Sequence, residues 1–414
     1  MNTKFLLSTL LIAGVMHADA QHNRSTYAIT GDGNNDFVWM NIRQVDLSTG
    51  QVTKTLFQRT DNTYRMTNLD LQNSTSPVTS TGLPTDLFSS TEYPTGTFVA
   101  AAAFDRRTNK LFFAPMRVGD LRWMDLSSDA PQFYKMSIPG FKTMDPNDEA
   151  SNITRMVIGA DGNGYALSND GNHFFTFTTG KKPVVRQLGN LIDDPANAGM
   201  SIHNKCSSWG GDMIADAFGK LYVISASHAI FKIDVTTRVA TFMGHIEGLP
   251  AGYTTNAAAV NDNGEVVLGS ANTFQGYYLM NINDRKAVKM EGSDVRYNVS
   301  DFANANLLLQ KEANELSNSK LPVVTPSANA KVFPNPVSNG HFNVLLENME
   351  QGRYTVVVAD LAGRIVLTRS TRIIGDGAQT ERISLSKNLT GGVYIVKVIN
   401  ENNVIVLNEK VVVQ

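Results

Sequence analysis

The sequence predicts an all-β protein, with a β-propeller of about five four-stranded blades followed by a small immunoglobulin-like β-sandwich. Three observations predict this fold. Pairs of short apolar strands recur with a period of about 50 residues, which is typical of propeller blades. The unpaired strands at the two ends of the repeat region complement each other. After residue 330 the chain changes to strands of alternating polarity.

One type of hairpin recurs from residue 39 onward, with an apolar strand, a polar turn and a second strand. Its first copy contains "VDLSTGQV" (45–52), in which Asp46 and the Ser48-Thr49-Gly50 run have turn chemistry. We interpret this phrase as scaffold, the turn between the two outer strands of a blade. The copies occupy residues 39–56, 121–137, 173–189, 229–244 and 277–290.

A second type of hairpin precedes four of these copies, and two hairpins together make one four-stranded blade. Its copies occupy residues 99–115, 154–169, 211–226 and 256–271. The third of these predicted inner turns is "DAFGK", whereas the second is "DGNG" (161–164), which looks like the start of a calcium loop. Since both stand at the same place in a blade, a tight hairpin turn explains "DGNG" better than metal binding.

The two ends of the repeat region each carry a strand without a partner. Only "TYAIT" (26–30) precedes the first hairpin, and "VSDFANANLLL" (299–309) follows the last blade. Pairing residues 299–309 with the N-terminal strands would close the ring and leave no exposed sheet edges. We therefore expect a propeller domain at residues 21–309, with a sixth blade possible if residues 58–97 contain a degenerate one.

A separate domain is predicted at residues 331–414. Residues 310–330 are polar, contain two prolines and lack periodicity, as linkers do. Beyond them, apolar residues alternate with polar ones on short strands, which predicts a small antiparallel sandwich. The alternating apolar positions include Phe342, Val344 and Leu346, then Tyr394, Val396 and Val398.

This C-terminal region resembles a known family, the type A C-terminal sorting domain of the Por or type IX secretion system of Bacteroidetes. The resemblance rests on "VFPNPVSNGHFNV", "GRYTVVVADLAGRIV", "LTGGVYIVKV" and the closing "NEKVVVQ", in that order within residues 331–414. It implies that the type IX machinery recognises this domain and carries the chain through the outer membrane. It also implies removal of the domain by the system's sortase, with release of the protein or its attachment to the cell surface.

The first residues have the pattern of a secretory signal peptide. Lys4 precedes the apolar run of residues 5–15, and Ala18-Asp19-Ala20 supplies small residues for cleavage after Ala20. The run is shorter than the roughly 20 apolar residues that span a bilayer. We expect an exported, soluble chain without a transmembrane segment. Cys206 is the single cysteine, so stability cannot come from an internal disulfide.

The charge of the chain argues against nucleic acid as a partner. The 414 residues include 36 basic and 38 acidic ones, for a formal net charge of -2. The basic residues are interspersed with acidic ones and form no run that would follow a phosphate backbone. An extracellular ligand, such as a glycan, a protein or a polymer, remains the expected partner.

The repeats predict long connections on one face of the ring. These connections include residues 30–36, 58–97, 114–120, 138–152, 190–207 and 270–276, whereas the other turns are short. Long loops on a rigid ring are how binding surfaces are built, although tolerated insertions would look the same.

Two metal hypotheses on this face are weak. Asp32, Asn34 and Asp36 have the spacing of calcium ligands, but Phe37 replaces the turn glycine and Arg43 replaces the bidentate Glu, so a hydrogen-bonded loop is favoured. His203 and Cys206 have H-x-x-C spacing without the second pair that zinc requires. We expect no cofactor, with calcium as the weak exception.

Two functions stay open at this stage. The first is a non-catalytic binding protein, which we favour, and its candidate ligand-binding residues are Arg117, Asp120, His203, Trp209, Asp212, His228, Asn256, Phe274 and Asp301. The second is a secreted propeller hydrolase or lyase acting on an extracellular polymer. Its candidate catalytic residues are Asp212, Asp301 and His203, because Asp212 and Asp301 are expected to begin inner strands and to line the channel with Arg155 and Asn256.

Overall fold

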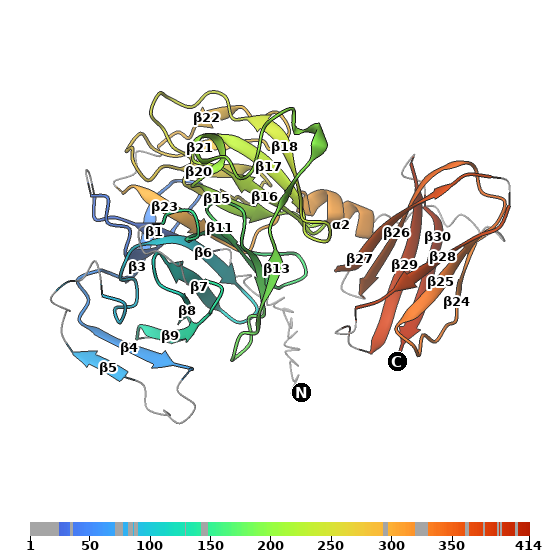
Figure 1. The fold of residues 1–414 in the computed structure, drawn as a ribbon, viewed down its shortest axis with the longest axis horizontal. Helices are drawn as coiled ribbons and strands as arrows, with labels where there is room; N and C mark the ends of the chain where they lie inside the picture. Colours follow the sequence, from blue (N-terminus) through green and yellow to red (C-terminus); the bar gives the residue numbers. More distant parts are fainter. Residues whose placement is uncertain are drawn as a thin grey trace, which may run out of the picture.

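The computed structural model confirms the predicted fold class. It describes residues 25–414 with gaps at 34–35, 71–77, 82–85, 87–89, 129, 142–147, 293–296, 319–329, 361–363, 376, 387–388, 390 and 402–404. The predicted signal peptide at residues 1–20 lies outside this part. Two β-rich bodies follow each other along the chain, the propeller and the C-terminal sandwich, with helix α2 (Gln310–Asn318) after the propeller (Figure 1).

The ring is closed by its two ends. The last strand of the propeller pairs antiparallel with the first, and Ala28 faces Phe302 in this register. The closing strand covers only residues 299–303 of the predicted stretch, and Leu308 instead bridges Asp216. Blade 1, from axis to rim, consists of β23 (Val299–Ala303), β1 (Thr26–Thr30), β2 (Asn41–Val45) and β3 (Val52–Phe57).

Blade 2 carries two strands more than the repeat predicts. Residues 58–97 form no sixth blade in their described part, because β4 (Thr63–Asn68) pairs parallel with the rim strand of blade 2 and β5 (Val78–Thr81) pairs with β4. The strands from axis to rim are β6 (Val99–Asp105), β7 (Lys110–Pro115), β8 (Asp120–Asp125) and β9 (Gln132–Ser137).

The remaining three blades follow the predicted two-hairpin plan. In blade 4 the short strand β14 (Ile192–Asp193) adds a parallel partner at the rim, before helices η1 (Pro195–Asn197) and α1 (Lys205–Ser208). Blade 3 contains β10 (Ile153–Ile158), β11 (Gly164–Ser168), β12 (Phe174–Phe177) and β13 (Val185–Gly189). Blade 4 contains β15 (Asp212–Ala215), β16 (Lys220–Ile224), β17 (Ala229–Asp234) and β18 (Val239–His245). Blade 5 contains β19 (Ala257–Val260), β20 (Val266–Gly269), β21 (Tyr278–Met280) and β22 (Ala287–Lys289).

Apolar clusters fill the spaces between neighbouring blades, including the space between blades 5 and 1. Successive residues of a strand point to opposite faces of its sheet. Phe112 therefore joins the cluster with blade 3, while Phe113 joins the cluster with blade 1. Val266 and Val267 divide in the same way between blades 4 and 1. Because both faces of each blade are buried, the strands read as nearly continuous apolar runs.

The turn phrases are scaffold, as predicted. Asp46 Oδ1 accepts the Ser48 amide at 2.8 Å, and Gly50 takes a positive φ of 70° that favours glycine. Asp161 of "DGNG" likewise accepts the Asn163 amide at 3.0 Å and the Tyr165 hydroxyl at 2.8 Å. Local hydrogen bonds therefore occupy these carboxylates.

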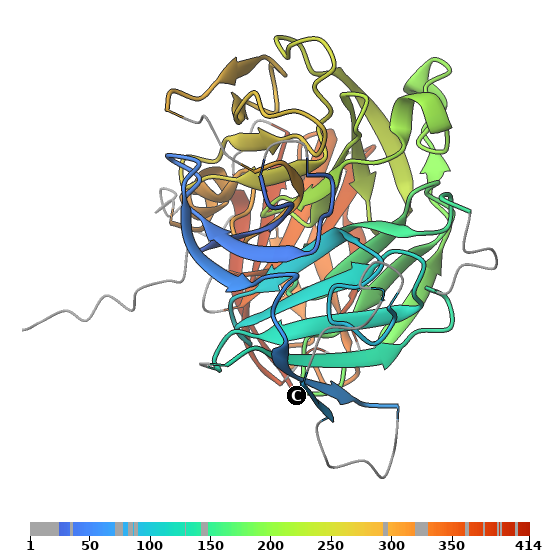
Figure 2. The ribbon, with the colours of Figure 1, turned by 90° about the vertical axis from the view of Figure 1, so that its left-hand side faces the viewer.

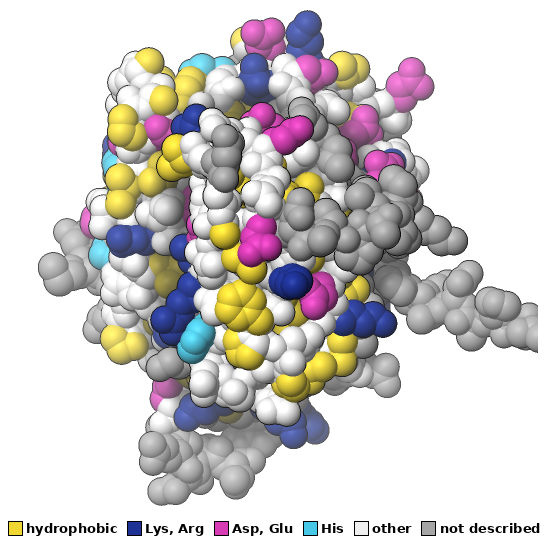
Figure 3. Space-filling model, turned by 90° about the vertical axis from the view of Figure 1, so that its right-hand side faces the viewer, with side chains coloured by type: hydrophobic (Ala, Val, Ile, Leu, Met, Phe, Trp, Pro, Cys, Tyr) yellow, Lys and Arg dark blue, Asp and Glu magenta, His cyan; other side chains and the backbone are white. Residues whose placement is uncertain are grey.

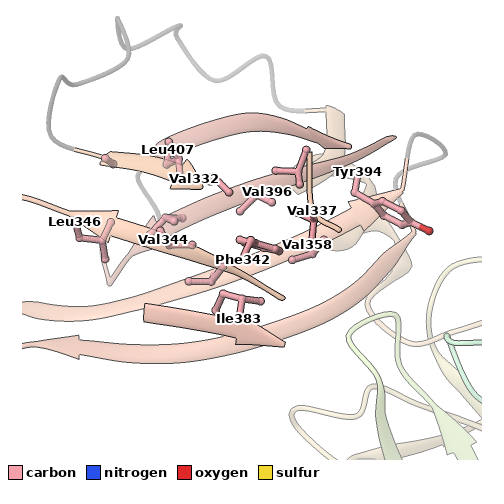
Figure 4. Packing of buried hydrophobic residues seen from close by; sticks show 14 of the residues in the cluster. Val332, Val337, Phe342, Val344, Leu346, Val358, Ile383, Tyr394, Val396 and Leu407 are labelled. Carbon is pink, nitrogen blue, oxygen red and sulfur yellow. The ribbon is translucent and has the colours of Figure 1, made fainter. Parts of the chain in front are cut away.

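The C-terminal domain is a two-sheet sandwich with its own core. One face of each sheet is apolar, so Phe342 and Val344 of one sheet pack against Val358 and Val396 of the other (Figure 4). One sheet contains β24 (Ala330–Phe333), β25 (His341–Leu346) and β28 (Gln379–Ser384). The other contains β27 (Ile365–Ile373), β26 (Gly352–Asp360), β29 (Gly392–Asn400) and β30 (Ile405–Val413).

Candidate functional site

The long connections lie at one end of the ring because neighbouring strands of a blade run antiparallel. The connections at this end join β1 to β2, β7 to β8, β11 to β12, β16 to β17 and β20 to β21 within blades, and they join successive blades; those from β11 to β12 and from β16 to β17 are as short as the turns at the other end. We call this end the loop-rich face. The chain leaves the ring at the opposite end, where Leu308 bridges Asp216 of an inner turn. Viewed as in Figure 2, the C-terminal sandwich lies behind the propeller.

A cleft of about 1250 Å³ lies at the end with the short turns. Its walls are the turn at 261–265, helix α2 and residues of the C-terminal sandwich, among them Asp360 and Lys397. The wall that the sandwich provides is therefore lost when the sandwich is absent. The cleft is not a feature of the propeller alone.

Residues 201–211 form a compact segment on the loop-rich face. His203 Nδ1 lies 2.7 Å from the Asp170 carbonyl oxygen, and the Trp209 indole N–H donates to the His203 carbonyl at 3.1 Å. Lys205 Nζ lies 5.1 Å from the centre of the Trp209 ring. Cys206 is exposed and does not join His203 in a metal site among the described residues. The two candidates His203 and Trp209 are thus hydrogen-bonded to each other within one loop.

Arg155 holds this segment against blade 3. Its side chain is fully buried, and its guanidinium donates to four backbone carbonyls. Those carbonyls belong to Ser168 and Asn169 of blade 3, and to Ser208 and Gly210 of the segment. Burial lowers the pKa of Arg155 to about 10, still high enough to keep the cation. Arg155 therefore anchors a loop and does not line the channel, where the sequence analysis had placed it.

Asp212 and Asp301 come together near the axis, as expected for residues of inner strands. Both side chains are fully buried. Asp212 opens β15, whereas Asp301 is inside β23 and does not begin it, which corrects the expected position. Burial raises the pKa of both carboxyls, and the charge of Asp212 raises the pKa of Asp301 further.

The pair has no open path to a polymer. The void between the inner strands measures only about 10 Å³, because small side chains such as Ala102 and Ala258 let the strands approach closely. A void of this size holds about one water molecule. His203 contacts the Asp170 carbonyl instead of the carboxyl pair. The structure therefore does not bring His203 together with the two carboxyls.

The candidates of blades 4 and 5 lie along the next connections. His228 Nε2 is 2.6 Å from the Tyr253 carbonyl oxygen, and the His228 backbone has a positive φ of 73°. Asn256 Oδ1 accepts the Ala271 amide at 3.1 Å and the Thr254 hydroxyl. Phe274 is half-buried. Asn256 therefore stabilises its own loop, and the expected place in the channel wall is not observed.

Arg117 and Asp120 differ in exposure. Arg117 is exposed, and its backbone amide donates to Asn152 Oδ1 at 2.8 Å. Asp120 is buried and accepts from Arg122 at 2.9 Å. Arg122 also donates to the carbonyls of Tyr93 and Pro94. Only Arg117 of these two candidates is available to a ligand.

The proposed calcium ligands Asp32 and Asp36 bind arginines instead. Arg59 lies 2.8 Å from Asp32 and 3.1 Å from Asp36, and Arg43 lies 3.3 Å from Asp32. Asn34 lies outside the described residues. Two guanidinium groups occupy the acidic side of the loop, where a cation would be repelled.

The described part of the chain was compared with the requirements of a metal centre and of a membrane-spanning helix. It contains no group of three or more His, Cys, Asp or Glu side chains arranged to hold a metal ion. None of its helices has the length and apolar character needed to cross a bilayer.

Sequence reasoning missed Arg43 and Arg122 as loop anchors. Both are buried on the third strand of a blade, and Arg43 donates to Thr30 Oγ1 and to the Gly31 carbonyl. The available signal was a lone arginine within an apolar strand, in "NIRQV" and "DLRWMD". Such a residue needs several acceptors to be buried.

Comparison with protein families identifies the C-terminal sandwich. Residues 331–414 match the model of the secretion system C-terminal sorting domain, which confirms the resemblance seen in the sequence. This domain marks proteins that the type IX secretion machinery exports to the cell surface or beyond. The chain is thus an exported β-propeller protein. No curated protein matches the chain.

The similar solved structures match this chain at low identity and low TM-score. PorZ of Porphyromonas gingivalis, a surface component of its type IX secretion system, is 13% identical, with 94% of this chain and 52% of PorZ covered and a TM-score of 0.33. Virginiamycin B lyase of Staphylococcus aureus is 11% identical, with 77% and 85% covered and a TM-score of 0.29. A quinoprotein alcohol dehydrogenase-like protein of Bacteroides thetaiotaomicron is 14% identical, with 69% and 67% covered and a TM-score of 0.33. The chain spans about half the length of PorZ.

Proposed function

Because residues 331–414 are a secretion system C-terminal sorting domain, we propose that the propeller is a cell-surface binding protein. It recognises an extracellular glycan, protein or polymer through its loop-rich face. The sortase of the secretion system removes the sorting domain, and the propeller is then released or attached to the surface.

The observation that carries this proposal is the placement of the long connections. They gather at the end of the ring away from the exit of the chain toward the sorting domain. A face with this position stays accessible both before and after the sorting domain is removed. Loops without a core role on a rigid scaffold commonly carry binding residues.

The loops are also held in fixed positions, which favours binding because less conformational entropy is lost. Arg155 fixes residues 208–210, and Arg122 fixes residues 91–94. Phe274 and Trp209 are half-buried, so each keeps some ring surface for an apolar sugar face or an apolar side chain. Arg117 adds an exposed cation.

The hydrolase or lyase alternative finds no supporting observation among the described residues. Its candidate acids, Asp212 and Asp301, have no exposed surface. A general acid must come within hydrogen-bond reach of its substrate. A polymer cannot reach this pair without opening the ring.

The test is a binding screen of the exported chain against glycans, polymers and surface proteins, run beside hydrolysis and lyase assays. Two variants probe the loop-rich face: Phe274→Ser removes an aromatic surface, and Arg117→Asn removes a cation while tolerating the positive φ of 63°. Val288→Ala changes an exposed rim residue of β22 and serves as control. Binding that both site variants weaken and the control retains supports the proposal. Turnover of a polymer, or binding unaffected by both variants, contradicts it.

A further inference from the structure

The two buried carboxyls near the axis belong to strands that meet only when the ring is closed. Asp301 lies on β23, the closing strand, and Asp212 lies on β15 of blade 4. β19 lies between these strands and contacts both. The pair therefore links the closing strand β23 to blade 4 across the inner strand of blade 5.

The hydrogen bonds of the pair are unequal. Asp212 accepts three backbone N–H groups, one from each of the three strands: Met213 at 2.6 Å, Ala258 at 2.7 Å and Phe302 at 3.2 Å. Neither carboxyl oxygen of Asp301 meets the geometry of a hydrogen bond with a donor in the described residues, and the Ala102 amide of β6 is the one backbone N–H directed at this carboxyl. The side chain that it meets is the Asp212 carboxyl. One carboxyl has the surroundings of an anion, and the other has those of a neutral acid.

We propose that Asp301 stays protonated and donates its proton to the Asp212 carboxylate, so that one shared proton ties the closing strand β23 to blade 4. The pair then carries one negative charge and one O–H···O⁻ hydrogen bond. Such charge-assisted bonds are among the strong ones in proteins. Closure of the ring thereby depends on retention of a proton.

The charged groups around the pair agree with a single negative charge. Arg155 of β10 is the nearby cation: the carboxylate of Asp170, and to a lesser extent that of Asp212, raises the pKa of its guanidinium against the effect of burial. Asp105, at the far end of β6, is bound by Arg107 at 3.0 Å. Tyr27 of β1 packs in the apolar cluster between blades 1 and 2. β19 and β20 contribute no titratable side chain.

The proton sets the direction of a pH dependence. The folded-state pKa of each carboxyl lies above the unfolded value, chiefly because both are buried. Between these values the folded chain binds more protons than the unfolded chain, so stability falls as the pH rises. The loss begins above the ordinary aspartate pKa of about 4.

The experiment compares Asp301→Asn with Asp212→Asn in the full chain. In Asp301→Asn the new amide would donate an N–H to the Asp212 carboxylate and replace the proton permanently. In Asp212→Asn one carboxylate oxygen becomes an NH₂ group. This group would face backbone N–H donors, and a single oxygen would be left to accept hydrogen bonds from them. We expect Asp301→Asn to melt at or above the wild-type temperature at about pH 8, with a flatter pH profile than the wild type, and Asp212→Asn to melt lower at about pH 5 and about pH 8.

Infrared spectroscopy with ¹³C-aspartate labelling provides a direct readout. The wild type should show a protonated carboxylic acid band at neutral pH that Asp301→Asn lacks. Absence of the band in the wild type would overturn the proposal, as would equal destabilisation by the two variants. A calcium- or potassium-dependent rise in melting temperature that Asp301→Asn abolishes would show that a bound cation, and not a proton, lies between the two carboxyls. This result would also overturn the proposal.

Discussion

Asp301 on β23 lies opposite Ile29 on β1, so the beginning and the end of the propeller sequence are neighbours in one sheet. The adjacent Ser300 hydroxyl donates to the Val99 carbonyl of blade 2 at 2.8 Å, and the Phe302 amide donates to Asp212 of blade 4. One five-residue strand thus connects blades 1, 2 and 4. The stability of the whole ring depends on it.

A chain that ends at residue 298 should not form a stable ring. Loss of β23 exposes the edge of β1 and uncovers the cluster that contains Val299 and Phe302. A chain that ends at residue 318 keeps every blade and is the matched control. We expect that only the shorter chain aggregates or unfolds at a lower urea concentration. A shorter chain that is monomeric and as stable as its control would contradict the closure argument.

Arg155→Met should lower the free energy of unfolding by about 3–5 kcal/mol, because it leaves buried carbonyls without donors. Arg155→Lys keeps the charge but not the planar set of donors, and we expect only partial rescue. Lys220→Met removes a cation that is 38% exposed and pairs with Asp234, so its cost should stay below about 1 kcal/mol. Urea unfolding measures all three. Equal effects of Arg155→Met and Lys220→Met would disprove the anchoring role of Arg155.

Calcium should not stabilise the loop that holds Asp32 and Asp36. Arg59→Ala should lower the free energy of unfolding by at most about 1 kcal/mol, since the ion pairs are partly exposed, and high salt should reduce the difference. Thermal unfolding with and without calcium or a chelator tests this. A clear fall in melting temperature on chelation would restore the metal hypothesis.

Phe342→Ala should impair export, because it creates a cavity in the core of the sorting domain. Phe342 is fully buried, and such truncations cost about 3–5 kcal/mol. Val393→Ala changes a residue that is 36% exposed and leaves the core intact. The surface around the sorting domain mixes hydrophobic, basic and acidic side chains (Figure 3). The measurement is the fraction of protein at the cell surface or in the medium. Normal export of Phe342→Ala together with loss for Val393→Ala would show that surface recognition decides export and that folding does not.

The candidate site was predicted in part. Gathering of the long loops at one face followed from strand alternation, and the meeting of Asp212 and Asp301 followed from placing both on inner strands. The roles of Arg43, Arg122 and Arg155 did not follow, because each guanidinium binds carbonyls of distant loops. The extra rim strands β4 and β14 were also missed, since they pair parallel with strands far along the chain.

The amino-acid sequence by itself determined the repeating hairpins, their turns, the complementary ends and the sorting domain, because strand alternation and turn chemistry act between near neighbours in the chain. Only the tertiary structure decided which polar side chains are accessible. Burial depends on how tightly the inner strands converge, and that convergence buried Asp212 and Asp301 completely while Arg117 on a peripheral loop stayed exposed.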